Sequence, residues 1–164
     1  MQYDSETQIH VPYCFGCSPD NPHGLKIDFT IKDNFVIGEF TSDTHHMGPP
    51  DAVHGGIIAT LIDESISFFG RGVLKEDVRT MRVEIVFRNQ APIGERLRVE
   101  ARLQEEKSRK LIITARVYTD KNTIAEATGT LFKVKRRERK GSPMKKAVKE
   151  LVVPLLLRPF LRVS

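Results

Sequence analysis

The chain has 164 residues, of which 40% are hydrophobic and 29% are charged. This length and composition fit one globular domain with a sizeable core and argue against a disordered chain. The formal net charge is +5, but residues 133–164 hold 11 Lys and Arg against 2 Asp and Glu. Because the basic excess belongs to this C-terminal part, nucleic-acid binding by the whole chain is disfavoured.

The first ten residues, MQYDSETQIH, contain neither the basic nor the apolar region of a secretory signal. The longest apolar run, residues 151–157, has seven residues and includes Pro154, so it is too short to span a bilayer. These observations predict a cytoplasmic protein.

Periodic patterns predict the elements of one domain over residues 1–134. The segment 1–24 ends in HVPYCFGCSPDNPHG, whose Pro, Gly and Asn residues predict a loop. Apolar and polar residues then alternate in the manner of half-buried strands. The predicted strands cover residues 25–31, 35–41, 78–89, 95–106, 110–120 and 123–134.

A single helix is predicted over residues 55–69, between the second and third strands. Its apolar residues cover more than one stripe, which is typical of a helix buried on nearly all sides. Gly70 and Gly72 are expected to end it. The order β-β-α-β-β-β-β predicts an α+β fold, in which a curled antiparallel sheet surrounds one long buried helix.

Residues 135–164 are predicted to form a basic, amphipathic extension with a short C-terminal helix. Ser142 is the expected N-cap and Pro143 the first helical residue. The preferred interpretation is a helix docked on the domain or on a neighbouring subunit. Contact with a membrane surface or an acidic partner is the alternative.

Candidate catalytic residues stand at the start of the predicted helix and inside it. Gly55 and Gly56 would expose backbone N–H groups at a helix N-terminus, where a developing oxyanion is stabilised. Asp63, expected to be buried, could activate a water as general base or act as a nucleophile itself. Eight residues of helix place Gly55 and Asp63 about 12 Å apart along the axis. One carbonyl cannot contact both, so the site is expected to combine two subunits.

The motif VHGG (53–56), the aspartate nine residues after His54 and the upstream CFGC…NPHGL segment together carry a family resemblance. Residues 13–134 resemble the hotdog-fold acyl-CoA thioesterases of the phenylacetate-pathway and small human mitochondrial type, a superfamily that includes 4-hydroxybenzoyl-CoA thioesterases. The resemblance implies hydrolysis of acyl-CoA without a cofactor, at sites between two protomers of a dimer or a dimer of dimers.

The same resemblance suggests roles for further residues. Thr80 matches the place of a serine that helps to orient water, and Glu64 is a rival to Asp63 because some branches use a glutamate on this helix. His54 is expected to position the loop. Related enzymes often carry an asparagine where this chain has Gly48, and His46 is a candidate substitute for it.

Two further features leave alternatives open. Thr60, one turn before Asp63, could hydrogen-bond to Asp63 or to its own helix backbone. Cys14 and Cys17 form a CxxC motif flanked by His10 and His23, which could bind zinc or act in redox chemistry. The preferred interpretation is a packed loop without a metal, because no second CxxC and no βαβ pattern are present.

The sequence thus predicts hydrolysis of a small, medium-chain or aryl acyl-CoA thioester. The alternative of another class is a non-enzymatic acyl-CoA sensor or carrier on the same fold. A hydratase is less favoured, since the paired His and acid motifs of such enzymes are absent from the sequence. Nucleic-acid binding ranks last.

Overall fold

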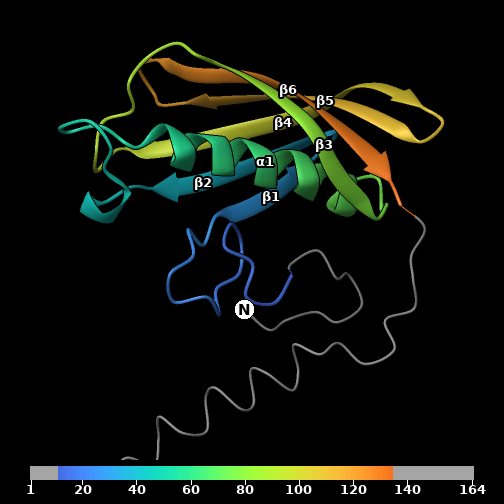
Figure 1. Cartoon of the computed structure of the whole chain (residues 1–164), viewed down its shortest axis with the longest axis horizontal. Coiled ribbons are helices and arrows are strands. Elements are labelled where there is room, and N and C mark those ends of the chain that lie inside the picture. The colour runs from blue at the N-terminus through green and yellow to red at the C-terminus, as the bar shows by residue number, and fades with distance from the viewer. Residues whose placement is uncertain (1–10, 135–164) are drawn as a thin grey trace, which may run out of the picture. The chain divides into compact units, whose positions relative to one another are not determined.

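The computed structural model describes residues 11–134, which fold as six strands and one long helix in the predicted order (Figure 1). The predicted C-terminal helix and His10 lie outside the described residues. The elements are β1 (Asp28–Lys32), β2 (Phe35–Thr41), the 3-10 helix η1 (Thr44–His46), α1 (Gly55–Gly72), β3 (Val78–Phe87), β4 (Arg96–Lys107), β5 (Lys110–Tyr118) and β6 (Thr123–Lys133). The short helix η1 was not predicted.

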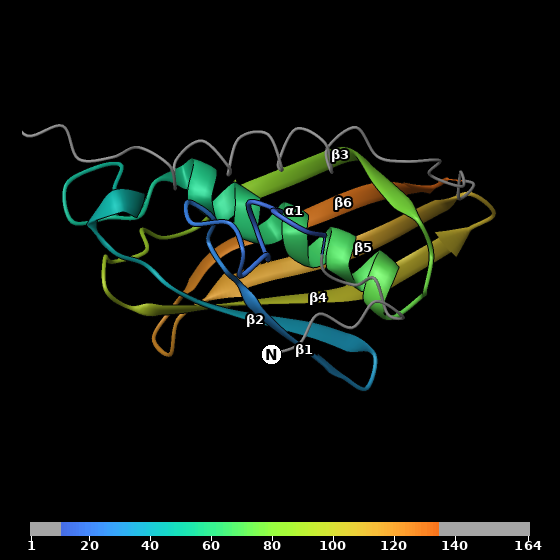
Figure 2. The ribbon, with the colours of Figure 1, turned by 90° about the horizontal axis from the view of Figure 1, so that it is seen from below.

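The strands form one antiparallel sheet in the order β1-β2-β4-β5-β6-β3. The chain leaves the β1–β2 side of the sheet, passes through α1, and returns as β3 at the opposite edge. Figure 2 shows α1 lying across the strands, with the sheet curled around it. The predicted α+β architecture is therefore confirmed.

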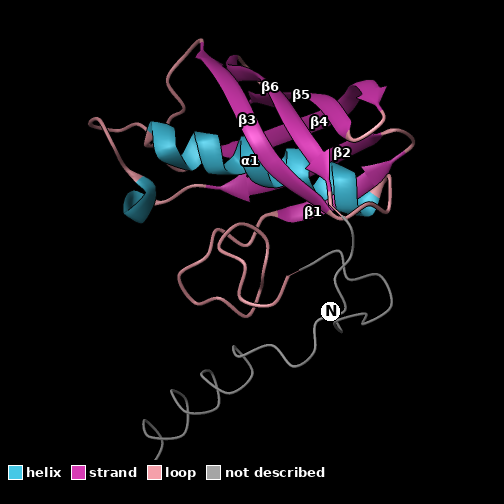
Figure 3. Cartoon of the chain, turned by 45° about the vertical axis from the view of Figure 1, so that its right-hand side comes forward, coloured by secondary structure: helices cyan, strands magenta, loops and turns pink. Residues whose placement is uncertain are grey.

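Figure 3 shows α1 against the curled sheet. The buried apolar side chains of α1 and of the strands form one core cluster between them. Leu97, Val99 and Ala101 of β4 are buried, which confirms the alternation that predicted this strand. They pack into one cluster with Leu61 and Ile66 of α1. Burial of each large apolar side chain contributes about 1.5–3 kcal/mol to folding, so this cluster fixes α1 against the sheet.

Strand β3 departs from the predicted alternation. The alternation of apolar and charged residues over residues 78–89 predicts that Met81 and Phe87 face the core. Their side chains are instead 52% and 54% exposed. The pairing of β3 with β6 shifts register between Thr80 and Arg82, which displaces Met81 from the regular pleat. Since β3 is an edge strand, its side chains also lack a neighbour on one side.

Helix α1 extends past its expected end. Gly70 and Gly72 lie inside the helix, and Val73 is the C-cap. A Cβ atom on Gly70 would lie 2.8 Å from a methyl group of Val78. Glycine at this position therefore allows close packing of α1 against β3 and does not end the helix.

One side of α1 is open to solvent, so the prediction of a helix buried on nearly all sides is wrong for the single chain. Gly56 and Asp63 are exposed, and Thr60 and Ser67 are partly exposed. Their spacing of three or four residues places all four on one face. None of the helices within residues 11–134 combines the length and apolar character required to cross a bilayer.

Candidate active site

The N-terminus of α1 presents one available backbone amide. His54 is the N-cap, and its Nδ1 accepts the N–H of Gly56 at 2.8 Å. The N–H of Gly55 has no acceptor among residues 11–134. The expected pair of amides at Gly55 and Gly56 is thus corrected to Gly55 alone, because the cap uses the second donor.

The loop before α1 holds His54 in place. The N–H of His54 donates to the carbonyl of His46 at 2.8 Å. The Nδ1 of His46 accepts the N–H of Asp43 at 3.0 Å, and the ring meets Phe40 edge-on at 4.9 Å between centroids. His46 therefore supports the loop through its backbone and its ring.

Gly48, the position at which the family resemblance implies an asparagine, lies against His54. A Cβ atom on Gly48 would stand 2.8 Å from the Cα of His54. Real Cβ atoms do not approach backbone so closely, so this loop conformation leaves no space for a side chain at position 48.

A chain of hydrogen bonds connects α1 to β3 at Asp63. The hydroxyl of Thr80 donates to Oδ1 of Asp63 at 2.7 Å. The hydroxyl of Ser67 lies 3.2 Å from the same Thr80 oxygen. The Thr80 hydroxyl has one proton and donates it to Asp63, so the Ser67 hydroxyl must be the donor to the Thr80 oxygen. The order Ser67 to Thr80 to Asp63 fixes the orientation of the carboxylate.

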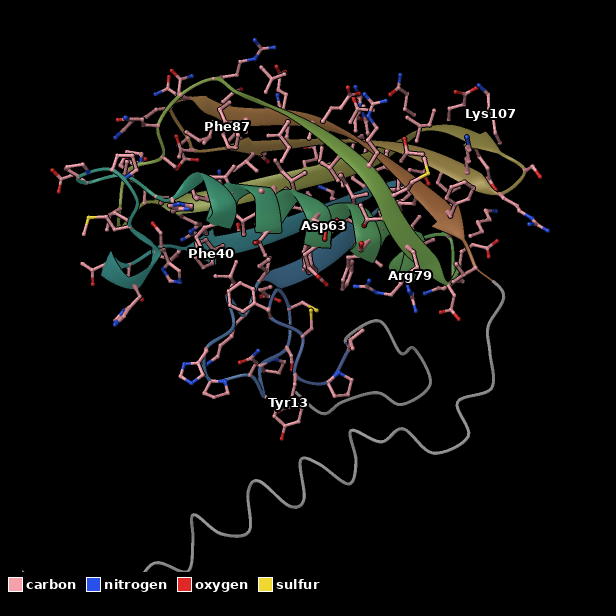
Figure 4. All side chains as sticks on the ribbon, in the orientation of Figure 1. Tyr13, Phe40, Asp63, Arg79, Phe87 and Lys107 are labelled. Carbon is pink, nitrogen blue, oxygen red and sulfur yellow. The ribbon has the colours of Figure 1, made fainter. Side chains whose placement is uncertain are left out.

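A cavity of about 280 Å³ opens at the start of α1. Its lining residues are Pro49, Ala52, Val53, Gly55, Ile58, Phe87, Arg88, Asn89, Gln90, Ala91 and Ile124. A Cβ atom on Gly55 would lie 3.6 Å from the ring of Phe87, so this ring stands beside the available amide. Figure 4 shows Phe87 toward the start of α1 and Asp63 near its middle. Gly55 and Asp63 are therefore not brought together in one chain.

Glu64, the neighbour of Asp63, points to a different environment. Its side chain is 13% exposed, and its Oε1 accepts a hydrogen bond from Nη2 of Arg71 at 2.8 Å. Its Oε2 lies 3.4 Å from the thiol sulfur of Cys14. The enclosed carboxylate of α1 is therefore Glu64, and the expectation that Asp63 is buried is wrong in the single chain.

Thr60 uses the second of its two possible partners. Its hydroxyl donates to the carbonyl of Gly56 at 2.9 Å and thus to its own helix backbone. Among the hydroxyl groups that the structure describes, the one that donates to Asp63 is therefore that of Thr80.

The two cysteines are free thiols that contact each other. The hydrogen bond from Cys17 lowers the pKa of the Cys14 thiol to about 7. The same contact, together with burial, raises the pKa of the Cys17 thiol. His23 is exposed and does not belong to this group.

Sequence reasoning missed Ser67 and the contact between Glu64 and Cys14. Ser67 could have been found from its position one helical turn after Asp63, on the same face. No local sequence pattern indicated the contact between Glu64 and Cys14, because the two residues are 50 positions apart in the chain.

Known proteins resemble this chain in sequence. The sequence profile of the thioesterase superfamily matches residues 51–126. The mouse acyl-coenzyme A thioesterase THEM4 is 31% identical over 118 residues, which cover 68% of this chain and 50% of the mouse protein. The rat THEM4 is 31% identical over 100 residues, or 59% of this chain and 42% of that protein. The chain thus spans half or less of the length of these relatives.

Solved structures show the same fold. A putative thioesterase of Ralstonia eutropha, related to phenylacetic acid degradation, has a TM-score of 0.64 at 19% identity, covering 71% of this chain and 92% of that one. A Streptococcus mutans protein bound to acetyl-CoA has a TM-score of 0.62 at 21% identity, with coverages of 68% and 91%. The PaaI protein of E. coli has a TM-score of 0.62 at 16% identity, and the match covers 68% of this chain and 81% of the PaaI chain. These structures show that the chain has the hotdog fold, and the profile match assigns residues 51–126 to the thioesterase superfamily.

Proposed function

We propose that this chain hydrolyses an acyl-CoA thioester, with Asp63 as the reacting carboxylate. The observation that carries the proposal is the oriented chain from Ser67 through Thr80 to Asp63. It holds one carboxylate oxygen and leaves Oδ2 without a partner among residues 11–134. An exposed carboxylate fixed in this way is available to a substrate, unlike Glu64, which is held by Arg71.

The reaction requires a new bond at the thioester carbonyl carbon. As general base, Oδ2 takes a proton from water while the water oxygen attacks that carbon; as nucleophile, Oδ2 attacks and forms an anhydride that water then cleaves. In both routes the carbonyl oxygen becomes negative and accepts the N–H of Gly55. The carbon–sulfur bond breaks when this oxyanion collapses, and in the nucleophilic route this step forms the anhydride before water cleaves it. CoA leaves as a thiolate that takes up a proton.

A second copy of the chain would complete the site. Within residues 11–134, β3 pairs with β6 on one side and with no strand on the other. Met81, Val86 and Phe87 expose large apolar groups on this strand, which favours pairing with another edge. An antiparallel pair of β3 strands centred on residues 83–84 sets Phe87 of one copy opposite Thr80 of the other. Phe87 lies beside Gly55 and Thr80 binds Asp63, so the two halves of the site would meet.

A panel of short, long and aromatic acyl-CoAs tests the proposal. Release of free CoA would be followed with a thiol reagent, and binding would be measured separately by calorimetry. Turnover of at least one thioester is the expected result, and the panel then identifies the acyl class. Binding without thiol release would contradict hydrolysis and would favour the acyl-CoA sensor or carrier.

The Thr80 hydroxyl supplies a sharper test of the carboxylate. Thr80→Val keeps the side-chain shape and removes the donor to Asp63. A hydrogen bond to a charged group is worth about 1.5–3 kcal/mol, so we expect kcat to fall about 10- to 100-fold with little change in KM. Thr80→Ser keeps the hydroxyl and should restore most of kcat. Equal kcat values for the valine and serine variants would remove Thr80 from this role.

A further inference from the structure

Two cysteines and a glutamate from distant parts of the chain converge beside α1. Cys14 and Cys17 belong to a turn of the N-terminal loop, and Glu64 belongs to α1. The two sulfurs and one carboxylate oxygen all lie within 4.8 Å of one another. These three residues are called the Cys–Glu cluster below. The hydrolytic site uses none of them.

The cluster matches the ligand spacing of a tetrahedral metal site. With metal–sulfur bonds of about 2.3 Å and metal–oxygen bonds of about 2.0 Å, tetrahedral geometry separates sulfur from oxygen by about 3.5 Å. The observed distance from Sγ of Cys14 to Oε2 of Glu64 is 3.4 Å. A metal ion could therefore enter without a movement of α1 relative to the loop.

The two carboxylate oxygens of Glu64 have different partners. Arg71 donates to Oε1, while Oε2 faces the cysteines. Carboxylate ligands of metals are commonly held by a hydrogen bond of this kind. Two thiolates, one carboxylate and the guanidinium of Arg71 would balance a divalent cation, so the filled site would carry no net charge. Such neutrality favours binding at a position of low exposure.

The loop already holds both sulfurs toward α1. The N–H of Ser18 donates to the carbonyl of Cys14 at 3.2 Å, which closes the turn that contains both cysteines. The Ser18 hydroxyl accepts the N–H groups of Tyr13 and Asp20. A Cβ atom on Gly16 would lie 2.6 Å from Cγ of Glu64, so only glycine lets the turn approach this closely.

We propose that the Cys–Glu cluster binds a thiophilic divalent cation, with Zn²⁺ as the favoured ion. Cys14, Cys17 and Glu64 supply three ligands, and water occupies the fourth position on the partly exposed side of Cys14. Binding displaces the two thiol protons to solvent. The ion ties the N-terminal loop to α1 at the residue next to Asp63. Glu64 is the ligand that the CxxC spacing alone did not reveal.

Metal titration of the full chain tests this site. The protein would be prepared without a histidine tag, under a non-thiol reductant so that the cysteines stay reduced. We expect one equivalent of Zn²⁺ to bind and to raise Tm, because a ligand of the folded state stabilises it. Co²⁺ should give a thiolate-to-metal charge-transfer band. X-ray absorption of the Zn²⁺-loaded wild type should show two sulfur neighbours at about 2.3 Å.

Matched variants assign the ligands. Glu64→Gln should weaken Zn²⁺ binding at least about 10-fold. Asp63→Asn, which alters the adjacent carboxylate, and His23→Ala, which alters an exposed histidine of the same loop, should leave binding unchanged. The proposal is overturned if the reduced wild type binds no stoichiometric Zn²⁺ or if the loaded ion has no sulfur neighbours. It is also overturned if Glu64→Gln binds as tightly as wild type. The absorption measurement needs no cysteine variant, so a folding defect in such a variant leaves the test intact.

Discussion

Asp63→Asn is expected to lower kcat by about 10²- to 10⁴-fold, the contribution typical of a general base. Asparagine keeps the size of the side chain and still offers an oxygen to the Thr80 hydroxyl. Its amide does not take a proton from water, nor does it form an anhydride. Because Asp63 is exposed, the fold and Tm should change little. Steady-state hydrolysis of the best acyl-CoA, with thermal unfolding in parallel, measures both effects.

Glu105→Gln is the matched control for the loss of a carboxylate away from the β3 edge. Glu105 lies on β4, where its side chain is 43% exposed and pairs with Lys107 at 2.7 Å. An exposed ion pair contributes little to stability, so this variant should retain wild-type kcat and Tm. An Asp63→Asn enzyme as active as Glu105→Gln would show that another group drives hydrolysis.

The route taken by Asp63 is open to isotope labelling. A single turnover in ¹⁸O-labelled water leaves Asp63 unlabelled if it acts as a base. If Asp63 attacks and water then cleaves the anhydride at the aspartyl carbon, ¹⁸O enters its side chain. Mass spectrometry of the peptide that contains Asp63 distinguishes these outcomes.

Local patterns were sufficient to predict most of the fold. Leu97, Val99 and Ala101 alternate with charged residues, and a half-buried strand is the structure that separates such residues. The pattern failed at β3, where Met81 and Phe87 have the same alternation but lie on an edge with a register shift. A strand's position in the sheet depends on all the other strands, so its own sequence does not reveal it.

The candidate site was predictable only where it depends on local spacing. The HGG motif and Asp63 lie on one helix, and their separation follows from helix geometry. Whether a given helix face is open depends on packing with β3, so the exposure of Asp63 was missed. The N-cap bond from Gly56 to the His54 ring depends on a rotamer of His54 that the sequence does not specify. The contact between Glu64 and Cys14 depends on the path of the loop.

Gly55→Pro should remove the oxyanion donor and little else. Gly55 is the first residue of α1, where proline is favoured because its N–H has no helical partner. The preceding His54 has φ −61° and ψ 136°, a conformation that is compatible with a following proline. Loss of one oxyanion donor typically costs about 10²- to 10³-fold in kcat. Hydrolysis should fall by this factor while circular dichroism and Tm stay near their wild-type values.

Gly55→Ala is the control, since it adds a Cβ atom at ordinary contact distance from Phe87 and keeps the N–H. It should retain most of the activity that Gly55→Pro loses. Equal losses in the two variants would attribute the effect to steric crowding in the cavity and would remove the Gly55 amide from the oxyanion role.

Mixing Gly55→Pro with Asp63→Asn tests whether two copies share each site. If the Gly55 amide of one copy acts with Asp63 of the other, a mixed dimer holds one intact site and one site with both defects. Random exchange makes half of the dimers mixed, so activity should recover to about a quarter of the wild-type value. A site contained in a single chain predicts no recovery on mixing. Successive affinity purification on two different tags, one on each variant, would verify that mixed dimers had formed. Recovery would then show that the thioester lies between two copies of the chain, with the Gly55 amide supplied by one copy and Asp63 by the other.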